Sequence, residues 1–199
     1  MSNVTWFNSL KSTNSEAKEH IEEYDNLSVI ATYEQSAGRG QGDHTWYATP
    51  GKNLTFTIIF KPEGLLASDA LLLTQITTIS LLSYLKKKHI NARIKWPNDI
   101  WVEDKKICGI LIENILEGTY VKSSLIGIGL NVNEKNWPEE LPNPISICEL
   151  TGEEYNIKKE LNSFHKEFCR HAEMISSEDG RNYLKKKFEE KVFRLPASL

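Results

Sequence analysis

The sequence has little of what marks a disulfide-bonded or metal-binding protein. Its three cysteines, Cys108, Cys148 and Cys169, are odd in number and far apart, and no Cys-x-x-Cys pair occurs. Such a set argues against a disulfide framework and suits a reducing compartment. The five histidines show no zinc-ligand spacing. We therefore expect a cytoplasmic protein without a structural metal.

Long apolar runs and an excess of positive charge are also missing. Residues 1–7 lack the basic start and apolar stretch of a signal peptide, and polar residues interrupt every apolar window well short of a membrane span. The formal net charge is −3, so the broad basic surface of a DNA-binding domain is not expected. These absences predict no membrane and no nucleic-acid partner.

What is present is the pattern of a mixed domain. The chain has 199 residues, 40% of them hydrophobic, which suits one substantial core and is short for two full-size domains. Helices are predicted at about 13–24, 68–89, 158–174 and 180–191, and strands at 27–34, 53–61, 92–95, 99–103, 107–113 and 123–132. Tight turns at Asp104-Lys105 and Glu117-Gly118 join neighbouring strands as hairpins. We predict a single α+β domain over 1–199, with a mostly antiparallel sheet and helices packed on one face.

Two of the helices carry start signals. Thr13-Asn-Ser-Glu16 has the form of a capping box, in which the Thr13 hydroxyl and Glu16 satisfy each other's backbone amides. Ser68 is the expected N-cap of the long, mostly apolar helix that follows it.

A glycine-rich loop that holds a cation and ends in an aromatic ring is the first chemical feature. It runs Gln35-Ser-Ala-Gly-Arg-Gly-Gln-Gly-Asp-His-Thr-Trp46. Its glycines let backbone amides approach an anion, and Arg39 adds a charged, planar set of donors. The Gly-x-Gly-x-Gly spacing matches neither a P-loop nor a dinucleotide fingerprint. Such a loop alone is more often a plain connection, but Trp46 at its end favours a ring-binding pocket.

Lys95-Trp-Pro-Asn-Asp99 is the second chemical feature. Pro97 fixes its own φ and pushes Trp96 into an extended conformation, so Asn98 and Asp99 are presented at a set angle. Asn-Asp after proline is commonly a turn, and Lys106 on spacing alone would be a solvated residue at a strand edge. Beside a cationic glycine loop, these groups are what is needed to hold a carboxylate against a nucleoside triphosphate.

Both stretches, together with Ser12-Thr13-Asn14 and Gly127-Ile-Gly-Leu-Asn131, stand in the order found in biotin protein ligases, and the sequence resembles that family over nearly its whole length. The resemblance implies the class II aminoacyl-tRNA synthetase-like fold of the family's catalytic domain and the activity of a biotin–[acetyl-CoA-carboxylase] ligase. Biotin's carboxylate attacks the α-phosphate of ATP, giving biotinyl-5′-adenylate and pyrophosphate. A lysine of a biotin carboxyl carrier protein domain then attacks the adenylate and releases AMP.

The resemblance also implies a role for individual residues. Lys106 and Arg39 are the expected catalytic residues, and Asp99 is the expected Mg²⁺ ligand, with Asn98 beside it. Expected biotin contacts are Ser12, Thr13, Asn14, Gln35, Gly38, Arg39, Gly40, Gln41, Lys106, Gly109, Leu111, Gly127 and Gly129, of which the last four small or apolar positions leave room for the bicycle. Expected ATP contacts are Arg39, Trp46, Lys95, Asn98, Asp99, Lys106 and Asn131.

The sequence departs from the family in two respects. Many members carry further arginines in the glycine loop, where this chain has Gln41 and His44, so Lys52 or the metal is expected to contribute more. Bacterial members usually continue into a small C-terminal β-barrel, and this sequence stops about where that module should begin. No helix-turn-helix precedes Val4, so repressor activity is not expected. The resemblance is compatible with a homodimer.

Two alternatives stay open. A lipoate–protein ligase would share the fold, although lipoate ligases lack the Lys-Trp-Pro-Asn-Asp element. A non-catalytic module that binds biotin or biotinyl-AMP would suit the arginine-poor loop. Such a module would have lost catalytic activity. The sequence argues against that loss, because it retains Lys106, Arg39, Asn98 and Asp99 together.

Overall fold

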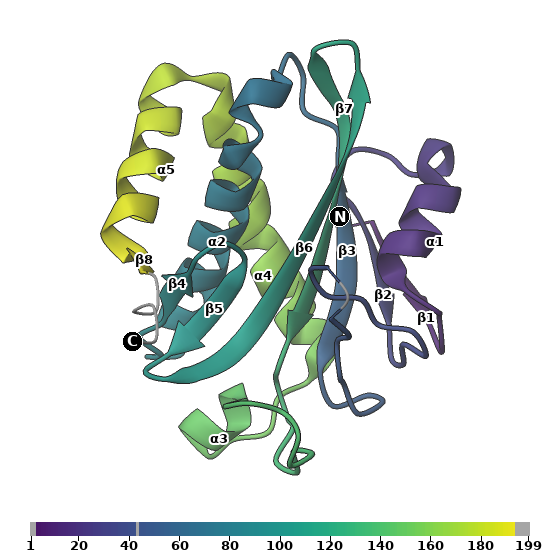
Figure 1. Cartoon of the computed structure of the whole chain (residues 1–199), viewed down its shortest axis with the longest axis vertical. Coiled ribbons are helices and arrows are strands. Elements are labelled where there is room, and N and C mark those ends of the chain that lie inside the picture. Colours follow the sequence, from purple (N-terminus) through teal and green to yellow (C-terminus); the bar gives the residue numbers. More distant parts are fainter. Residues whose placement is uncertain (1–2, 43, 194–199) are drawn as a thin grey trace.

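The computed structural model describes residues 3–42 and 44–193, and its strands form an eight-stranded sheet in the order β1-β2-β3-β7-β6-β5-β4-β8 (Figure 1). The strands are β1 Val4–Phe7, β2 Ser28–Thr32, β3 Leu54–Phe60, β4 Arg93–Lys95, β5 Asp99–Val102, β6 Lys105–Glu117, β7 Tyr120–Leu130 and β8 Val192–Phe193. Only β1 on β2 and β4 on β8 are parallel pairs within this sheet. The predicted α+β class with a mostly antiparallel sheet is confirmed.

Helices cover the sheet unequally. They are α1 Thr13–Glu19, α2 Leu71–Lys86, α3 Ile147–Thr151, α4 Ile157–Ala172 and α5 Glu178–Lys191. The longer helices α2, α4 and α5 lie together on one face (Figure 1), as predicted. The short α1 lies on the opposite face, where Ala17 packs with Ile30 of β2 and Leu125 of β7. Within the described part of the chain, no helix is both long and apolar enough to cross a bilayer.

The main core lies between the sheet and the three longer helices, and alternation along the strands decides what it contains. Phe56 and Ile58 of β3 point into this core, where the Phe56 ring lies 5.6 Å from that of Phe164 in α4. Burying such side chains contributes about 1.5–3 kcal/mol each. Because successive side chains point to opposite faces, Thr55 and Thr57 lie on the α1 face. The same rule in β7 sends Gly127 and Gly129 to that face, so small and polar residues line this part of it.

Several short elements differ from the sequence prediction. The strands β1 and β8 and the helix α3 were not predicted; β1 and β8 are short edge strands that depend on pairing with distant segments. The hairpin turns lie one residue away from their predicted positions, at 103–104 and 118–119. Ser68 does not cap α2, which begins at Leu71 after a 3₁₀ turn, Ala67–Asp69, and has Ala70 as its N-cap.

The predicted capping box at Thr13 is also wrong. Ser12 is the N-cap of α1 and makes no side-chain capping bond, and the helix ends at Glu19 rather than near 24. Oε1 of Gln35 accepts from the backbone N–H of Thr13 at 2.8 Å and from its hydroxyl at 3.2 Å. A side chain from beyond β2 thus satisfies a free amide of the first turn, in place of the local partner that the sequence suggested.

Candidate functional site

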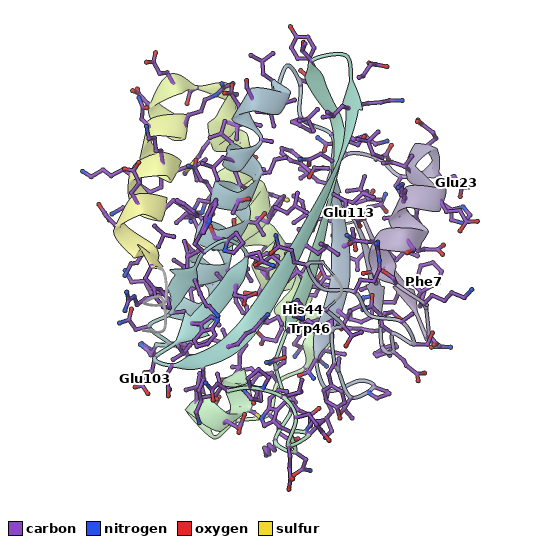
Figure 2. The ribbon with its side chains drawn as sticks, in the orientation of Figure 1. Phe7, Glu23, His44, Trp46, Glu103 and Glu113 are labelled. Atoms are coloured by element: carbon purple, nitrogen blue, oxygen red, sulfur yellow. The ribbon has the colours of Figure 1, made fainter. Side chains whose placement is uncertain are left out.

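A cleft of about 600 Å³ opens on the α1 face of the sheet. Its walls come from the start of α1, the glycine loop, the β4–β5 turn, β6, β7 and the segment before α3. Figure 2 shows His44 and Trp46 of the loop beside the long strand β6, with Glu113 farther along that strand. The cleft therefore gathers segments that are distant in the sequence.

Most of the residues singled out in the sequence line this cleft. They are Ser12, Thr13, Asn14, Gln35, Arg39, Gly40, Gln41, Trp46, Lys95, Asn98, Asp99, Lys106, Gly109, Leu111, Gly127 and Gly129. Gly38 and Asn131 are not part of its lining, and neither is Lys52. The side-chain amide of Asn131 is buried and donates to the carbonyls of Lys106, at 3.3 Å, and Ile145, at 3.0 Å. In this structure Asn131 fixes neighbouring backbone and does not face the cleft.

The end of the cleft beside α1 is built from neutral polar groups. Beyond the Thr13–Gln35 contacts, Oγ1 of Thr57 lies 2.8 Å from Oγ1 of Thr13 and 2.6 Å from Oδ1 of Asn14. Thr13, Asn14 and Thr57 are each at most 3% exposed. Buried polar groups joined in this way fix each other's orientation. This end can therefore offer fixed donors and acceptors to an uncharged polar ring.

Trp46 lies against the floor that the strand glycines make. A Cβ on Gly129 would lie 2.1 Å from Cε2 of Trp46, and one on Gly109 would lie 2.8 Å from its Cζ3. A Cβ on Gly127 would lie 2.4 Å from Oδ1 of Asn14. Side chains of the protein itself therefore pack against these three glycines, which also line the cleft. The indole Nε1 is buried and has no hydrogen-bond partner among the described residues.

A β-bulge turns Lys106 toward the cleft. Ile100 of β5 pairs with Cys108 of β6, whereas Trp101 pairs with Lys106, so Ile107 is the extra residue. Strict alternation would place Lys106 on the core side with Cys108 and Ile110, but the bulge reverses it. Nζ of Lys106 then lies 2.8 Å from Oδ1 of Asp99. The two groups assigned to substrate phosphate and metal are thus paired with each other.

The Lys95–Asp99 element is a tight turn between β4 and β5, and it lines the cleft as well. The Trp96–Pro97 peptide bond is cis. Asn98 ties the turn to β6, since its Nδ2 donates to the carbonyl of Ile110 at 3.0 Å and its own carbonyl accepts from the Ile110 amide at 2.9 Å. Nζ of Lys95 lies 4.2 Å from the Trp101 ring centroid, a cation–π contact.

The glycine loop folds back on itself as a small hairpin. The amide of Gly40 donates to the carbonyl of His44 at 2.7 Å, and that of Trp46 donates to the carbonyl of Gly38 at 3.0 Å. Arg39 projects from this hairpin and its Nη2 lies 2.9 Å from Oε2 of Glu113. Each of the two expected catalytic cations is therefore held by one carboxylate.

The chemistry of Asp99 fits a magnesium ion only together with substrate oxygens. Its Oδ1 is buried and lacks a hydrogen bond, because the Lys106 ion pair does not have hydrogen-bond geometry. Among the described residues, no group of three or more His, Cys, Asp or Glu side chains could hold a metal ion. Mg²⁺ commonly takes one or two carboxylates and completes its shell with phosphate oxygens and water.

Sequence reasoning missed several residues of the site. Thr55 lines the cleft, Thr57 organises its polar end, and Pro142 and Asn143 close it from the segment before α3. The alternation in β3 could have identified the two threonines, because their face is opposite to the apolar one. The contact of Glu113 with Arg39 joins positions 74 residues apart, and the sequence holds no local signal for it.

The chain is similar in sequence to several known ligases. A bifunctional ligase/repressor BirA from Bacillus subtilis is 33% identical over 129 residues, covering 63% of this chain and 39% of that protein. A biotin–[acetyl-CoA-carboxylase] ligase from Paracoccus denitrificans is 30% identical over 123 residues, covering 61% of this chain and 51% of that protein. The chain therefore spans about half the length of these relatives or less.

The fold has a close match among solved structures. A biotin protein ligase from Aquifex aeolicus, in complex with biotin and ATP, superimposes with a TM-score of 0.83 at 26% identity and covers 97% of this chain and 79% of that one. The model of the biotin/lipoate A/B protein ligase family matches residues 6–133. That span includes every residue singled out above from Ser12 to Asn131, and it is more than half of the sequence. The chain belongs to the biotin/lipoate A/B protein ligase family.

Proposed function

We propose that the protein is an ATP-dependent ligase that activates biotin as biotinyl-5′-AMP and transfers it to a lysine of a biotin carboxyl carrier protein domain. The observation that carries the proposal is one cleft with two cations, Arg39 and Lys106, and a neutral polar end at Thr13 and Gln35, behind which Thr57 bonds to Thr13. Family membership supports it, as does the similarity to a ligase whose structure contains biotin and ATP.

The first step demands positive charge where two anions meet. An oxygen of the biotin carboxylate forms a bond to the α-phosphorus of ATP, the bond from that phosphorus to the bridging oxygen breaks, and pyrophosphate leaves. Lys106 and Arg39 stabilise the negative charge that gathers there, because fixed donors in a partly desolvated cleft need no reorganisation. Lys106 first exchanges its contact with Asp99 for the incoming oxygens.

Asp99 would hold a Mg²⁺ ion, which when bound neutralises part of the triphosphate charge. Asn98 keeps the β4–β5 turn on β6, so the carboxylate next to it has a fixed place. Lys95 lies in the same turn and adds positive charge on this side of the cleft.

In the second step the amine of the carrier lysine attacks the acyl carbon of the mixed anhydride. A C–N bond forms, the C–O bond to the phosphate breaks, the amine loses a proton, and AMP leaves. The same cations stabilise the departing phosphate. A biotin carboxyl carrier domain is the proposed partner.

The polar end of the cleft favours biotin over lipoate, which the same family also accommodates. The ureido ring of biotin has N–H donors and a carbonyl acceptor, which suit the hydroxyl and amide groups of Thr13 and Gln35. A dithiolane ring has no such groups, so it would shield this polar end from water without a compensating hydrogen bond, at a cost of about 1–3 kcal/mol. Sites built for hydrogen bonding reject analogues that lack the partner groups.

Release of pyrophosphate from ATP by the purified protein tests the proposal. Release that depends on biotin and not on lipoate supports it, and transfer of biotin to an added carrier domain completes it. Release with lipoate alone selects the lipoate ligase. Biotin binding by calorimetry without pyrophosphate release selects a non-catalytic binding module and contradicts the proposal.

A further inference from the structure

We propose that Glu113 is a positioning residue that holds Arg39 of the glycine loop toward the cleft. Its effect on catalysis rests on the proposed function, whereas its effect on the loop does not. Glu113 lies on β6, and its carboxylate meets the loop from the α1 face of the sheet.

One carboxylate oxygen joins the loop to the polar end of the cleft. Oε2 of Glu113 accepts from Nη2 of Arg39 at 2.9 Å and from Nδ2 of Asn14 at 2.7 Å. The side chain of Asn14 is fixed in turn, because its Nδ2 also donates to the carbonyl of Leu111 at 3.3 Å and its Oδ1 lies 2.6 Å from the hydroxyl of Thr57. The acceptor for Arg39 is therefore held by a buried network.

Because Glu113 is held in place, the Arg39–Glu113 ion pair differs from an ordinary ion pair on a protein surface. Exposed pairs contribute little, because both long side chains must lose their freedom to meet. Here the Glu113 side chain is 30% exposed and Asn14, which holds it, is 3% exposed. Only Arg39, at 47% exposure, is left to be ordered by the contact. The loop hairpin thus gains a fixed attachment to the sheet.

The position of the carboxylate leaves the cleft side of Arg39 free. Arg39 lines both the cleft and a second, outer hollow of about 470 Å³ beside α1, whereas Glu113 lines the outer hollow and is not part of the cleft's lining. Glu113 therefore contacts the guanidinium from outside the cleft. A guanidinium has five N–H donors, so donors remain for an anion inside it. This arrangement favours orientation of Arg39 over competition with substrate.

The loop attachment is tested by amide hydrogen exchange of residues 38–42 and 44–46 in the ligand-free protein. Glu113→Gln removes the charge but keeps an acceptor for Asn14, so we expect protection of the loop to fall about tenfold while that of β3 and β7 stays unchanged. Glu117→Gln is the matched control, because Glu117 ends the same strand, is exposed, and makes no ion pair with the described residues. Equal loop protection in wild type and Glu113→Gln would overturn the proposal.

The catalytic consequence is tested by biotin-dependent pyrophosphate release. In Glu113→Gln, kcat should fall about tenfold to a hundredfold, as expected for a misplaced catalytic group, with KM for biotin changed less than about twofold because the ring contacts remain. In an Arg39→Ala background the same change should have no further effect. The positioning role would be overturned if Glu113→Gln lowered kcat equally in the Arg39→Ala background. It would also be overturned if Glu113→Gln alone raised kcat. If wild type itself releases no pyrophosphate, the proposed function fails, and the exchange data still decide whether Glu113 fixes Arg39.

Discussion

The indole of Trp46 occupies the space that any side chain at position 129 would need, since a Cβ there would lie 2.1 Å from its Cε2. The nearest neighbours of that Cβ are all atoms of Trp46, which belongs to a loop, and none belongs to backbone. The steric conflict in Gly129→Ala can therefore be relieved by movement of the indole.

For Gly129→Ala we expect a small loss of unfolding free energy, below the ~1–3 kcal/mol typical of an overpacked core. Affinity for biotinyl-AMP should fall roughly tenfold to a hundredfold, since stacking of a base on an aromatic ring contributes about 1–3 kcal/mol. Calorimetry would measure the affinity for biotinyl-AMP with and without Gly129→Ala, first in the wild-type protein and then in Trp46→Ala. If Gly129→Ala weakens binding equally when Trp46→Ala is already present, displacement of Trp46 is not the cause.

Lys106 should dominate the first chemical step. Lys106→Ala removes a fixed cation from the cleft, so adenylate formation should slow on the order of 10²–10³-fold. Biotin binding should change less, because Thr13 and Gln35 remain at the polar end of the cleft. Lys105→Ala is the control, since Lys105 is the adjacent, exposed residue of β6 and does not line the cleft. Single-turnover kinetics that show equal rates for the two variants would make Lys106 an ordinary surface residue.

Thr57 and Thr55 offer a matched test of the polar end. Thr57 is fully buried at 0% exposure and contacts both Thr13 and Asn14, so Thr57→Val should destabilise the fold by about 1–3 kcal/mol. Thr55→Val, two residues away on the same face, removes a hydroxyl that makes no hydrogen bond with the described residues and should change stability by less than about 0.5 kcal/mol. Urea unfolding measures the stability of the two variants. Equal midpoints would show that the hydrogen bonds of Thr57 contribute nothing to the stability of the fold.

The sequence predicted best those features that depend on the residues of a single segment. Alternating residues in β3 predicted a strand with one apolar face, and the helices predicted at 158–174 and 180–191 match α4 and α5 closely. The glycine loop and the Lys95–Asp99 element were predicted to act together, and the structure brings them to one cleft.

Features that depend on distant partners could not be predicted from local patterns. Alternation alone would have put Lys106 on the core side, because the bulge at Ile107 is set by pairing with β5. The signal at Thr13 suggested a local cap, yet Gln35 supplies that hydrogen bond. The link between Arg39 and Glu113 likewise arises only when the loop meets β6.

Buried histidines should make the fold sensitive to mild acid. Burial lowers the pKa of His171, helped by the charge of Arg170, and burial also lowers the pKa of His165. The unfolded chain then binds protons more readily than the folded one. The contribution of these histidines to the unfolding free energy is therefore fully present above the ordinary histidine pKa of 6.5, and it falls as the pH drops below that value.

His171→Gln should therefore flatten the fall of unfolding free energy between about pH 7 and 5.5, where each extra proton taken up by the unfolded chain costs up to ~1.4 kcal/mol per pH unit. His89→Asn is the control, because His89 is exposed and has a positive φ that asparagine tolerates. Chemical denaturation across this range measures the slope. A slope that His171→Gln leaves as steep as in wild type would assign the acid sensitivity to other groups.

The glycine loop should retain the adenylate weakly, because Gln41 and His44 stand in the cleft wall where further arginines would add charge. A charge-assisted hydrogen bond to the single phosphate of biotinyl-AMP contributes about 1.5–3 kcal/mol, which is roughly one to two decades in affinity. We therefore expect Gln41→Arg to slow dissociation of biotinyl-AMP and Arg39→Ala to speed it strongly.

Stopped-flow kinetics would measure the dissociation rate of biotinyl-AMP at low and at high salt. The comparison detects an electrostatic contact, because ions screen a partly exposed one. The gain from Gln41→Arg should shrink at high salt. An unchanged off-rate at low salt would show that the loop does not lack charge. Neutralisation of the phosphate would then fall to Lys95 or Mg²⁺, since Lys52 does not reach the lining of the cleft.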